Sequence, residues 1–272
     1  MRKSLSRKSI MRLVVIFLIL AVAGWMLVGC GGEESRTVQR YPDPVTLPSG
    51  LIIQDFRYGD GAALDRGDVF TVRYTTYLDN GSEVESEDAY TFIGGVGKVI
   101  PGLDQGISSM QVGGQRKLII PPSLAYGSAG KSPNIPPNAT LTMYLEVLSV
   151  AQKQITDGGV KYVDLLEGSG ETPVTGDKLV VNYTGWLQSD GTKFDSSLNE
   201  GREPFEFVFD TGAVIPGWDE GTASMRAGGT RVLIIPPGLA YGGSPPEGST
   251  IPPDATLIFE VELVQVIPPP GG

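Results

Sequence analysis

The side chains that most enzymes use for nucleophilic or acid–base chemistry are scarce in this chain. Its 272 residues include no histidine and one cysteine, Cys30. These counts exclude a Ser-His-Asp triad, a Cys-His pair, a Cys/His zinc site and a disulfide within the chain. We therefore expect a reaction that needs neither imidazole nor thiolate, and we expect no metal and no cofactor.

Phosphate and nucleic-acid sites are also disfavoured. The glycine-rich stretches 59–61, 94–98 and 168–170 lack the spacing or the following lysine of a P-loop, and turns between strands explain them. The formal net charge is −10, and a negative surface without a basic patch repels polyanions. We expect no nucleotide site and no nucleic-acid partner.

One short motif occurs twice and shows that the chain is built on a repeat. Residues 214–221 read Val-Ile-Pro-Gly-Trp-Asp-Glu-Gly, and residues 99–106 read Val-Ile-Pro-Gly-Leu-Asp-Gln-Gly. The length suggests two domains of about 100–150 residues. The second repeat carries extra residues between Asp195 and Phe205, which we expect in a surface loop. The predicted boundaries are leader 1–29, flexible tether 30–44, first domain 45–150, linker 151–157, second domain 158–267 and tail 268–272.

The motif predicts a short helix that must pack against another surface. Pro216 suits the first turn of a helix, and Asp219 and Glu220 match the positive end of its dipole, which is the only role we expect for these two acids. The helix should end at the glycines that follow Ala227, after about ten residues, which is too short for stability on its own. The face that we expect to be buried carries Trp218, Thr222 and Met225.

Alternating apolar and polar residues predict the sheets that would cover these helices. Period-two alternation runs through residues 69–78 and 179–187, and strands at 115–120 and 230–235 end at Pro-Pro pairs. The last strand of the second repeat alternates too, with an apolar face and a wet face. These faces carry, respectively, Leu257, Phe259, Val261 and Leu263, and Thr256, Glu260 and Glu262. We therefore expect an α+β fold with an antiparallel sheet on one short helix in each repeat.

The N-terminal residues predict export and lipid anchoring. Residues 1–12 are basic and residues 13–28 form an apolar run that closes on residues 27–30, Leu-Val-Gly-Cys, which resembles the lipobox of bacterial lipoproteins. The resemblance implies that Cys30 carries lipid, so the protein would lie outside the cytoplasm, anchored to a bacterial membrane. An uncleaved N-terminal anchor and a buried cysteine remain as alternatives, and the sequence does not separate an inner from an outer membrane.

The motifs of the second repeat resemble those of one enzyme family. They are, in order, Val-Asn-Tyr-Thr-Gly-Trp-Leu at 181–187, Asp-Gly-Thr-Lys-Phe-Asp-Ser-Ser at 190–197, Phe-Glu-Phe at 205–207, Val-Ile-Pro-Gly-Trp at 214–218, Leu-Ala-Tyr-Gly at 239–242 and Ile-Pro-Pro-Asp-Ala-Thr-Leu-Ile-Phe at 251–259. Together they are similar to the FKBP-type peptidyl-prolyl cis-trans isomerases. The resemblance covers residues 158–267. It implies two tandem FKBP-like domains, each a five- to six-stranded antiparallel sheet wrapped around one short helix.

The same resemblance implies a site for proline-containing polypeptides and for macrolide inhibitors. The substrate proline would enter an apolar pocket with Trp218 as its floor, and the Ile215 N–H and the Tyr241 hydroxyl would donate to substrate carbonyls. Differences around Thr250 and in the loop 244–249 leave the macrolide affinity open. The pocket residues carried over by motif are Tyr183, Phe194, Asp195, Phe205, Val214, Ile215, Trp218, Tyr241, Ile251 and Phe259.

Such a site would suit a chain without histidine. Rotation about an X-Pro amide breaks no covalent bond, and its barrier is ~18–20 kcal/mol. The twisted amide is less dipolar than the planar one, so an apolar site stabilises it relative to water. Each ~1.4 kcal/mol removed from the barrier speeds rotation about tenfold.

The first repeat departs from the family pattern at several site positions. Leu103 stands in place of tryptophan, Val84 and Met143 in place of phenylalanines, and Glu85 in place of aspartate. We expect the fold to survive. We predict that this repeat is weakly active or inactive and serves in peptide binding or spacing. The residues of this degenerate pocket are Tyr74, Glu85, Tyr90, Ile100, Leu103, Tyr126 and Ile135.

Two functions from different classes remain open. In the first, a membrane-tethered prolyl isomerase speeds the folding of exported proteins, whose X-Pro bonds otherwise interconvert in tens to hundreds of seconds. In the second, a membrane-tethered chaperone or interaction module binds extended segments, and its isomerase activity is incidental. We favour the first, with catalysis mainly in the second repeat. The client proteins, the residue preferred before proline and the oligomeric state cannot be read from the sequence.

Overall fold

The protein folds into two antiparallel β-sheets, each packed on one short α-helix. The computed structural model describes residues 41–270, which belong to one compact unit. Two α-helices and two 3-10 helices occur within these residues, and none of them is long and apolar enough to cross a membrane. The predictions for the leader and for Cys30 lie outside the described part of the chain.

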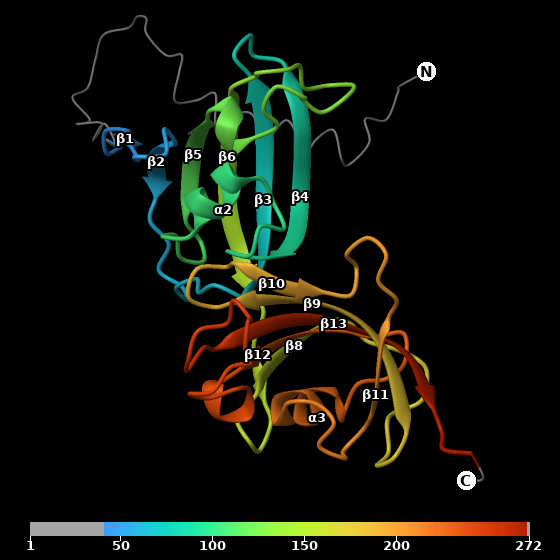
Figure 1. The fold of residues 1–272 in the computed structure, drawn as a ribbon. Helices are drawn as coiled ribbons and strands as arrows, with labels where there is room; N and C mark the ends of the chain where they lie inside the picture. Colours follow the sequence, from blue (N-terminus) through green and yellow to red (C-terminus); the bar gives the residue numbers. More distant parts are fainter. Residues whose placement is uncertain (1–40, 271–272) are drawn as a thin grey trace, which may run out of the picture. The chain divides into compact units, whose positions relative to one another are not determined.

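The first repeat builds a six-stranded sheet (Figure 1). Its elements are β1 (Val45–Thr46), β2 (Ile52–Arg57), β3 (Val69–Leu78), β4 (Glu83–Ile93), α2 (Pro101–Ile107), β5 (Gln115–Ile120), η1 (Pro122–Leu124) and β6 (Leu141–Val150). The strands hydrogen-bond in the order β1-β2-β5-β6-β3-β4. Helix α2 contacts β5, so the helix covers the sheet as the sequence predicts.

The second repeat builds a sheet of seven strands with the same central order. Its elements are β7 (Gln154–Ile155), β8 (Lys161–Leu166), β9 (Lys178–Leu187), β10 (Lys193–Ser196), β11 (Phe205–Val208), α3 (Pro216–Thr222), β12 (Thr230–Ile235), η2 (Pro237–Leu239) and β13 (Leu257–Ile267). The strands hydrogen-bond in the order β10-β9-β13-β12-β8-β7, and β11 also pairs with β9. The short strand β7 lies within the stretch predicted as the interdomain linker and pairs with β8.

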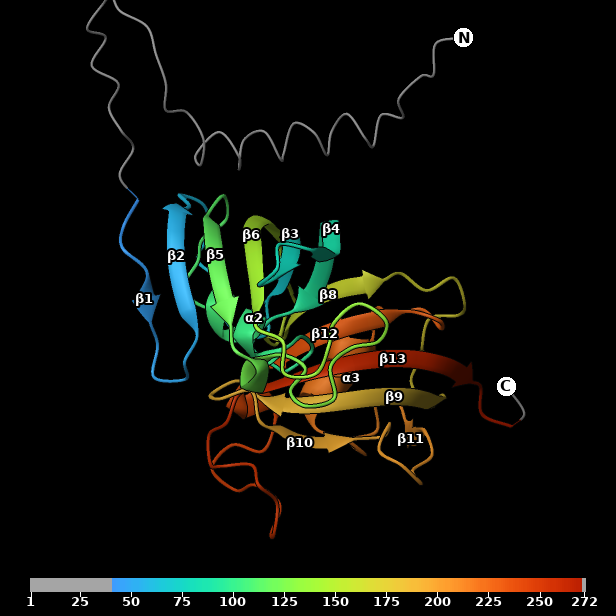
Figure 2. The same ribbon diagram turned by 90° about the horizontal axis from the view of Figure 1, so that it is seen from above.

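The sheets differ at the edge beside β3 and β9. In the first repeat this edge is the single strand β4, of 11 residues. In the second repeat β10 and β11 have four residues each and pair one after the other with β9, as Figure 2 shows. The extra residues between Asp195 and Phe205 form the exposed loop 198–204 that joins these strands. The prediction of a surface loop is therefore confirmed.

Helix α3 is shorter than predicted but buries the predicted face. It has seven residues, because after Thr222 the chain closes a turn in which the Met225 N–H donates to the Thr222 carbonyl. Trp218, Thr222 and Met225 are at most 4% exposed, which confirms the buried face. Gly217 lets the helix lie directly on β12, since a Cβ at this position would be 2.3 Å from Cγ2 of Ile235.

The acidic residues of the helices do more than match the helix dipole, which corrects our expectation. Asp219 accepts a hydrogen bond from the Asp210 N–H at 3.0 Å, and Glu220 accepts one from the Thr156 hydroxyl at 2.7 Å. In the first repeat Asp104 accepts two backbone N–H groups from the loop before α2. These charge-assisted bonds fix the loop before each helix and, in the second repeat, also the turn between β7 and β8.

The apolar faces of the two sheets form the two main cores. The predicted inner face of β13 is confirmed, because its four apolar residues are at most 3% exposed. The prediction of a wet opposite face is wrong in part, since Ile258 on that face is fully buried. It belongs to a third apolar cluster, to which both repeats contribute. The members of this cluster are Val69, Ile93, Val96, Val163, Trp186, Val232, Ile234 and Ile258.

A buried arginine ties sheet to helix in both repeats, and the sequence analysis did not anticipate it. Arg231 on β12 is 3% exposed, pairs with Asp164 on β8 at 2.7 Å and donates to the Gly221 carbonyl at the end of α3. Arg116 on β5 makes the same two kinds of bond, to Asp55 and to the carbonyl end of α2. The last carbonyls of a helix lack intrahelical partners, so each guanidinium satisfies one of them while an aspartate balances its charge.

Candidate functional site

Five aromatic side chains of the second repeat meet around helix α3. We call this group the aromatic site, and its members are Tyr183, Phe194, Phe205, Trp218 and Phe259. The ring of Trp218 lies 5.1 Å from that of Tyr183 and 5.3 Å from that of Phe259, with interplanar angles of 81° and 90°. Phe205 contacts the same ring at 5.8 Å and 84°. Phe207 packs on Trp218 as well, at 5.7 Å and 65°. Edge-to-face pairs set positive ring edges against negative ring faces, so four rings hold Trp218 in place.

The periodicities of strand and helix bring these rings together. Tyr183 on β9 and Phe259 on β13 face the same side of the sheet, because alternate residues of a strand share a face and the two strands are hydrogen-bonded neighbours. Strands β10 and β11 add Phe194 and Phe205 from the other edge of β9. Trp218 comes from the first turn of α3, which packs on this side.

Three hydrogen-bond donors at the aromatic site have no acceptor among residues 41–270. These are the Ile215 N–H, the Tyr241 hydroxyl and the buried indole Nε1 of Trp218. Burial raises the pKa of Tyr241, so its hydroxyl keeps its proton at neutral pH. Val214 and Ile251 pack against the same cluster and complete its apolar surroundings. A ligand with carbonyl oxygens would therefore meet free donors beside an apolar surface.

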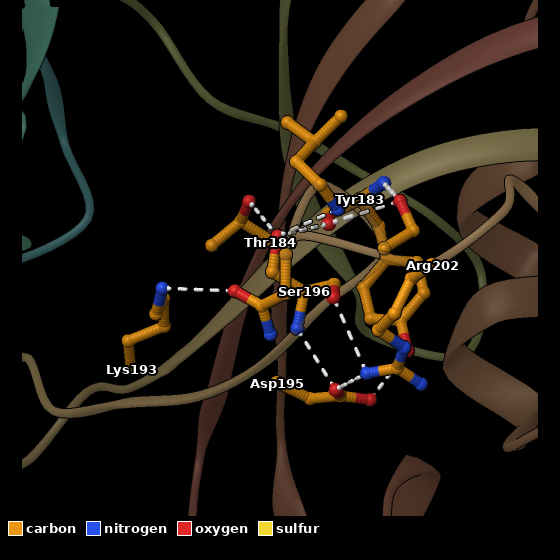
Figure 3. Close-up of polar contacts among 9 residues, drawn as sticks. Tyr183, Thr184, Lys193, Asp195, Ser196 and Arg202 are labelled. Atoms are coloured by element: carbon orange, nitrogen blue, oxygen red, sulfur yellow. Dashed lines mark hydrogen bonds and ion pairs between the residues drawn. The ribbon is translucent and has the colours of Figure 1, made fainter.

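A charged network borders the aromatic site (Figure 3). Asp195 accepts hydrogen bonds from the Tyr183 hydroxyl and from the guanidinium of Arg202, with which it also forms an ion pair. Burial by itself would raise the pKa of Asp195, but the bonds from Tyr183 and Arg202 outweigh burial and hold the pKa below its usual value. Burial, and then the bond to Asp195, raise the pKa of Tyr183. At neutral pH the carboxylate is charged and the phenol is protonated.

Two serines anchor this network to β9. The Ser197 hydroxyl accepts the Tyr183 N–H at 2.9 Å, and the hydroxyls of Ser196 and Thr184 are 2.9 Å apart. Figure 3 shows Ser196 next to Asp195, whose carboxylate accepts the Ser196 N–H at 2.9 Å. The Phe-Asp-Ser-Ser motif therefore works as a unit, because its serines hold the strand that carries the ring and the carboxylate.

Arg202 is a site residue that the sequence analysis missed. It lies in the loop between β10 and β11 and reaches back to Asp195 and to the Ser196 carbonyl. The sequence does hold a signal for this residue, because Arg202 is a cation among the extra residues of the second repeat. Spacing alone does not give the path of a loop, so it could not pair this cation with Asp195.

All ten residues predicted for the second repeat meet in this one place. Nine side chains line or contact the apolar cluster, and Asp195 joins through Tyr183. Their roles in binding and catalysis stay predictions.

The corresponding place in the first repeat holds fewer rings. Leu103 of α2 and Met143 of β6 are each 3% exposed where the second repeat has Trp218 and Phe259. Tyr74 keeps an edge-to-face contact with a ring on β4, at 5.9 Å and 87°. The predicted residues that share this cluster or contact it are Tyr74, Tyr90, Ile100, Leu103, Tyr126 and Ile135. An apolar site is retained, but its central ring is missing.

The charges of the first repeat are connected differently. Lys131, which the sequence analysis also missed, donates to Glu85 at 3.0 Å and to the Tyr126 hydroxyl at 3.3 Å. The hydrogen bond to Glu85 raises the pKa of Lys131, so the ammonium group stays charged. Tyr126 is the counterpart of Tyr241. In the first repeat this hydroxyl already accepts a hydrogen bond from a cation.

The titratable side chains of the two sites act through hydrogen bonds and ion pairs. Within the described part of the chain no cluster of three or more histidine, cysteine, aspartate or glutamate residues is arranged to hold a metal ion. The Tyr183 hydroxyl donates to the Asp195 carboxylate, and burial helps to keep Tyr183 and Tyr241 protonated. The second site can stack against a ring and donate hydrogen bonds, which suits the binding and twisting of an amide.

Comparison with known proteins points to one family. A family profile described as FKBP-type peptidyl-prolyl cis-trans isomerase matches residues 61–148 and 169–264. The chain is 34% identical over 268 residues to the human (Homo sapiens) peptidyl-prolyl cis-trans isomerase FKBP10, a match that covers 95% of this chain and 43% of that protein. It is 51% identical over 109 residues to the FK506-binding protein of Neisseria meningitidis serogroup B, covering 40% of this chain and 97% of that protein.

A solved structure is similar as well. The crystal structure of the three FKBP domains of wheat FKBP73 has 31% sequence identity and a TM-score of 0.41, and the match covers 82% of this chain and 97% of that one. The matched segments of the family profile cover more than half of the chain, so the protein belongs to the FKBP-type peptidyl-prolyl cis-trans isomerase family. It carries two FKBP-like domains, one per repeat. The chain spans less than half the length of the human relative.

Proposed function

We propose that this protein is a peptidyl-prolyl cis-trans isomerase of proline-containing polypeptides and that the second repeat supplies most of the catalysis. The observation that carries this proposal is the aromatic site around Trp218, with two free donors at its border. The first repeat has the same sheet and helix, but Leu103 stands where the central ring would be. Membership of an isomerase family supports the activity, and the difference between the repeats supports its assignment to one of them.

The mechanism that we propose is rotation in an apolar surrounding. The substrate proline packs against Trp218, while the Ile215 N–H and the Tyr241 hydroxyl donate to carbonyl oxygens of the peptide on either side. The planar amide is the more dipolar state, so removing water from it favours the twisted state. Each ~1.4 kcal/mol removed from the barrier raises the rate tenfold. A thousandfold acceleration therefore needs a barrier lower by only about 4 kcal/mol.

The charged network has a supporting role in this mechanism. Asp195 holds the Tyr183 hydroxyl and thereby the direction of a ring that packs edge-on against Trp218. Arg202 balances the carboxylate from the exposed loop. A fixed Tyr183 ring keeps the floor of the site in one orientation, which favours catalysis over loose binding.

For the first repeat we propose peptide binding with little catalysis. Its apolar cluster can accept a side chain, but Lys131 already bonds the hydroxyl of Tyr126. A carbonyl oxygen at this position would meet both the ammonium group and the hydroxyl. Such a site holds a peptide without the ring that would stabilise a twisted amide, and it would raise the local concentration of substrate for the second repeat.

We also propose that the protein works outside the cytoplasm, held at a bacterial membrane by lipid on Cys30, and that macrolides inhibit it. The apolar run that ends at the only cysteine supports the anchor. Replacement of Cys30 by serine in the full chain should move the protein from the membrane fraction to the soluble fraction and abolish labelling by a radioactive fatty acid. Unchanged labelling of the serine variant would contradict the anchor and leave the isomerase proposal untouched.

The isomerase proposal is tested with matched substitutions in the full chain. Phe194→Ala should lower kcat/KM at least tenfold on a chromogenic peptide with one X-Pro bond, and should slow a proline-limited refolding reaction equally. Val84→Ala, at the same position of the first repeat, should change either rate less than twofold. If the wild-type chain does not accelerate isomerisation, the proposal is wrong. If Phe194→Ala spares the refolding effect, a binding module with incidental activity is the better description.

A further inference from the structure

Gly185 occupies a crowded position beside the aromatic site. It lies on β9, opposite Phe259 on β13 and Asp195 on β10. A Cβ atom at this position would lie 2.6 Å from Cζ of Phe194 and 2.8 Å from Cε1 of Phe259. Both distances are far shorter than the separation of about 3.5–4.0 Å at which carbon atoms attract each other. No side chain fits here while the two rings keep their places.

The two rings that exclude a side chain form a pair. The centroids of Phe194 and Phe259 are 5.5 Å apart, and the ring planes cross at 88°. Phe259 in turn meets Trp218 at 5.3 Å and 90°. Because the three rings are in series, a displacement of either phenylalanine reaches the central tryptophan of the site.

The first repeat has threonine at the corresponding position. Thr76 lies on β3 opposite Met143 and Glu85, which are the counterparts of Phe259 and Asp195. The register of the two sheets therefore aligns this threonine with the glycine of the second repeat. The residue before the acid differs as well, because it is a valine in the first repeat and a phenylalanine in the second.

Thr76 takes up the space that the rings occupy in the second repeat. It is 1% exposed, and the smaller or more flexible side chains of Val84 and Met143 leave room for it. Its Oγ1 has no hydrogen-bond partner among the residues that the structure describes. A buried hydroxyl without a partner is unfavourable, so stability alone does not account for threonine at this position.

We propose that the residue at this position decides whether a repeat is active on X-Pro bonds, and that Gly185 positions the rings on which the activity of the second repeat depends. The proposal rests on the isomerase function proposed above. Glycine leaves room for the Phe194–Phe259 pair, which gives an apolar wall beside Trp218. Threonine excludes that pair and puts a hydroxyl in its place. Gly185 touches no substrate and acts through the two rings, so it is a positioning residue.

The test is a double-mutant cycle in the full chain, with kcat and KM measured on a chromogenic peptide with one X-Pro bond. Gly185→Thr should lower kcat/KM at least tenfold, because the added side chain displaces the ring of Phe194. Phe194→Val should lower it by a similar factor. The double variant Gly185→Thr/Phe194→Val should match Phe194→Val within twofold and should melt at a higher temperature than Gly185→Thr, because valine leaves room for threonine as it does in the first repeat.

Two outcomes would overturn the proposal. One is a Gly185→Thr variant that keeps kcat/KM within twofold of wild type. The other is an equal loss from Gly185→Thr with and without Phe194→Val, which indicates a general structural effect. If Gly185→Thr does not fold, Gly185→Ala takes its place in the same cycle, with an expected loss of at least threefold. An inactive wild-type chain would refute the isomerase function itself, which separates the two failures.

The reciprocal exchange tests the same position from the other repeat. The full chain with Trp218→Leu silences the second site and serves as background. Two sets of substitutions are added to this background. Both contain Val84→Phe, Leu103→Trp and Met143→Phe, and one also contains Thr76→Gly. The set that includes glycine should have at least tenfold higher kcat/KM than the set that keeps threonine. Equal kcat/KM of the two sets would show that this position does not control activity.

Discussion

Arg116 and Arg231 stand at matching positions of the two repeats and make the same bonds, whereas Leu103 and Trp218 also match in position but share little chemistry. Each arginine joins a neighbouring strand to the carbonyl end of the helix. These bonds do not involve the side chains of the site. The frame of this fold and its site are therefore physically separate, so a repeat can lose its central ring and keep its structure.

The charged residues extend the comparison. In the second repeat Asp195 bonds Tyr183 and a cation from the neighbouring loop, which leaves Tyr241 free. In the first repeat Glu85 bonds a cation that bonds Tyr126 instead. Each repeat has a network of one carboxylate, one cationic side chain and one tyrosine. In the first repeat the acid is the longer Glu85 and the cation comes from a different loop. The charged network therefore includes Tyr126 there, whereas in the second repeat it includes Tyr183.

The largest expected effect concerns the shared frame. Arg231→Met and Arg116→Met should each lower the free energy of unfolding of their repeat by about 3 kcal/mol, because each removes a buried guanidinium that bonds a helix carbonyl and a partly exposed aspartate. Urea unfolding followed by circular dichroism measures this loss. Arg202→Ala, which removes an exposed cation, is the control and should change stability little. A large loss of stability from only one of the two substitutions would contradict an equal structural role of the two arginines.

The next effect concerns the central ring. Trp218→Leu gives the second repeat the residue of the first and should lower kcat/KM about a hundredfold, which corresponds to about 2.7 kcal/mol of transition-state stabilisation. The control is Leu103→Ala, which should leave the rate of the full chain unchanged within twofold. A chromogenic X-Pro peptide reports both rates. Similar losses from the two substitutions would mean that both repeats are catalytic.

A smaller effect is expected from the two tyrosine hydroxyls. Tyr241→Phe removes a free donor and should lower kcat/KM about tenfold, in line with the loss of one hydrogen bond of about 1.4 kcal/mol. Tyr126→Phe removes a hydroxyl that Lys131 already bonds and should leave the rate unchanged. Isothermal titration with an unreactive proline peptide would show whether either substitution changes binding rather than rate. Equal effects of the two would contradict the separation of the sites.

The smallest effect is that of pH. The lowered pKa of Asp195 means that its bonds stabilise the folded site above the usual aspartate value near 4 and are lost only as pH falls through the lower folded value. The raised pKa values of Tyr183 and Tyr241 keep both phenols protonated in the neutral range. The isomerase rate should therefore be flat between about pH 5 and pH 9. A bell-shaped profile in that range would indicate proton transfer and a different mechanism.

Much of the fold could be predicted because its signals are local. Period-two alternation predicts the strands. A proline followed by apolar residues at helical spacing predicts the buried helix face with Trp218 and Thr222, and the buried Met225 in the turn beyond it. The end of helix α3 was misplaced, since a turn beyond Thr222 competes with the last helical bonds. The wet face of β13 was wrong at Ile258, because a strand does not reveal what packs on its outer side.

The site was predicted in composition but not in its connections. The ten residues of the second repeat came from motifs along the chain, and the structure brings them together around Trp218. Arg202 and Lys131 were missed because each acts through a loop whose path depends on the packing beneath it. The role of Gly185 was missed as well, since a glycine has no side chain to suggest one and its constraint comes from rings on other strands.

The repeat, the strand periodicity and the residue types of both sites can be read along the chain, because they depend on neighbours within a few positions. The fold sets which acid meets which cation, which tyrosine stays free and where a side chain cannot fit. These outcomes depend on contacts between residues that are distant along the chain, such as Arg231 with Asp164 and Gly185 with Phe259. Such contacts form only when the sheet closes on its helix.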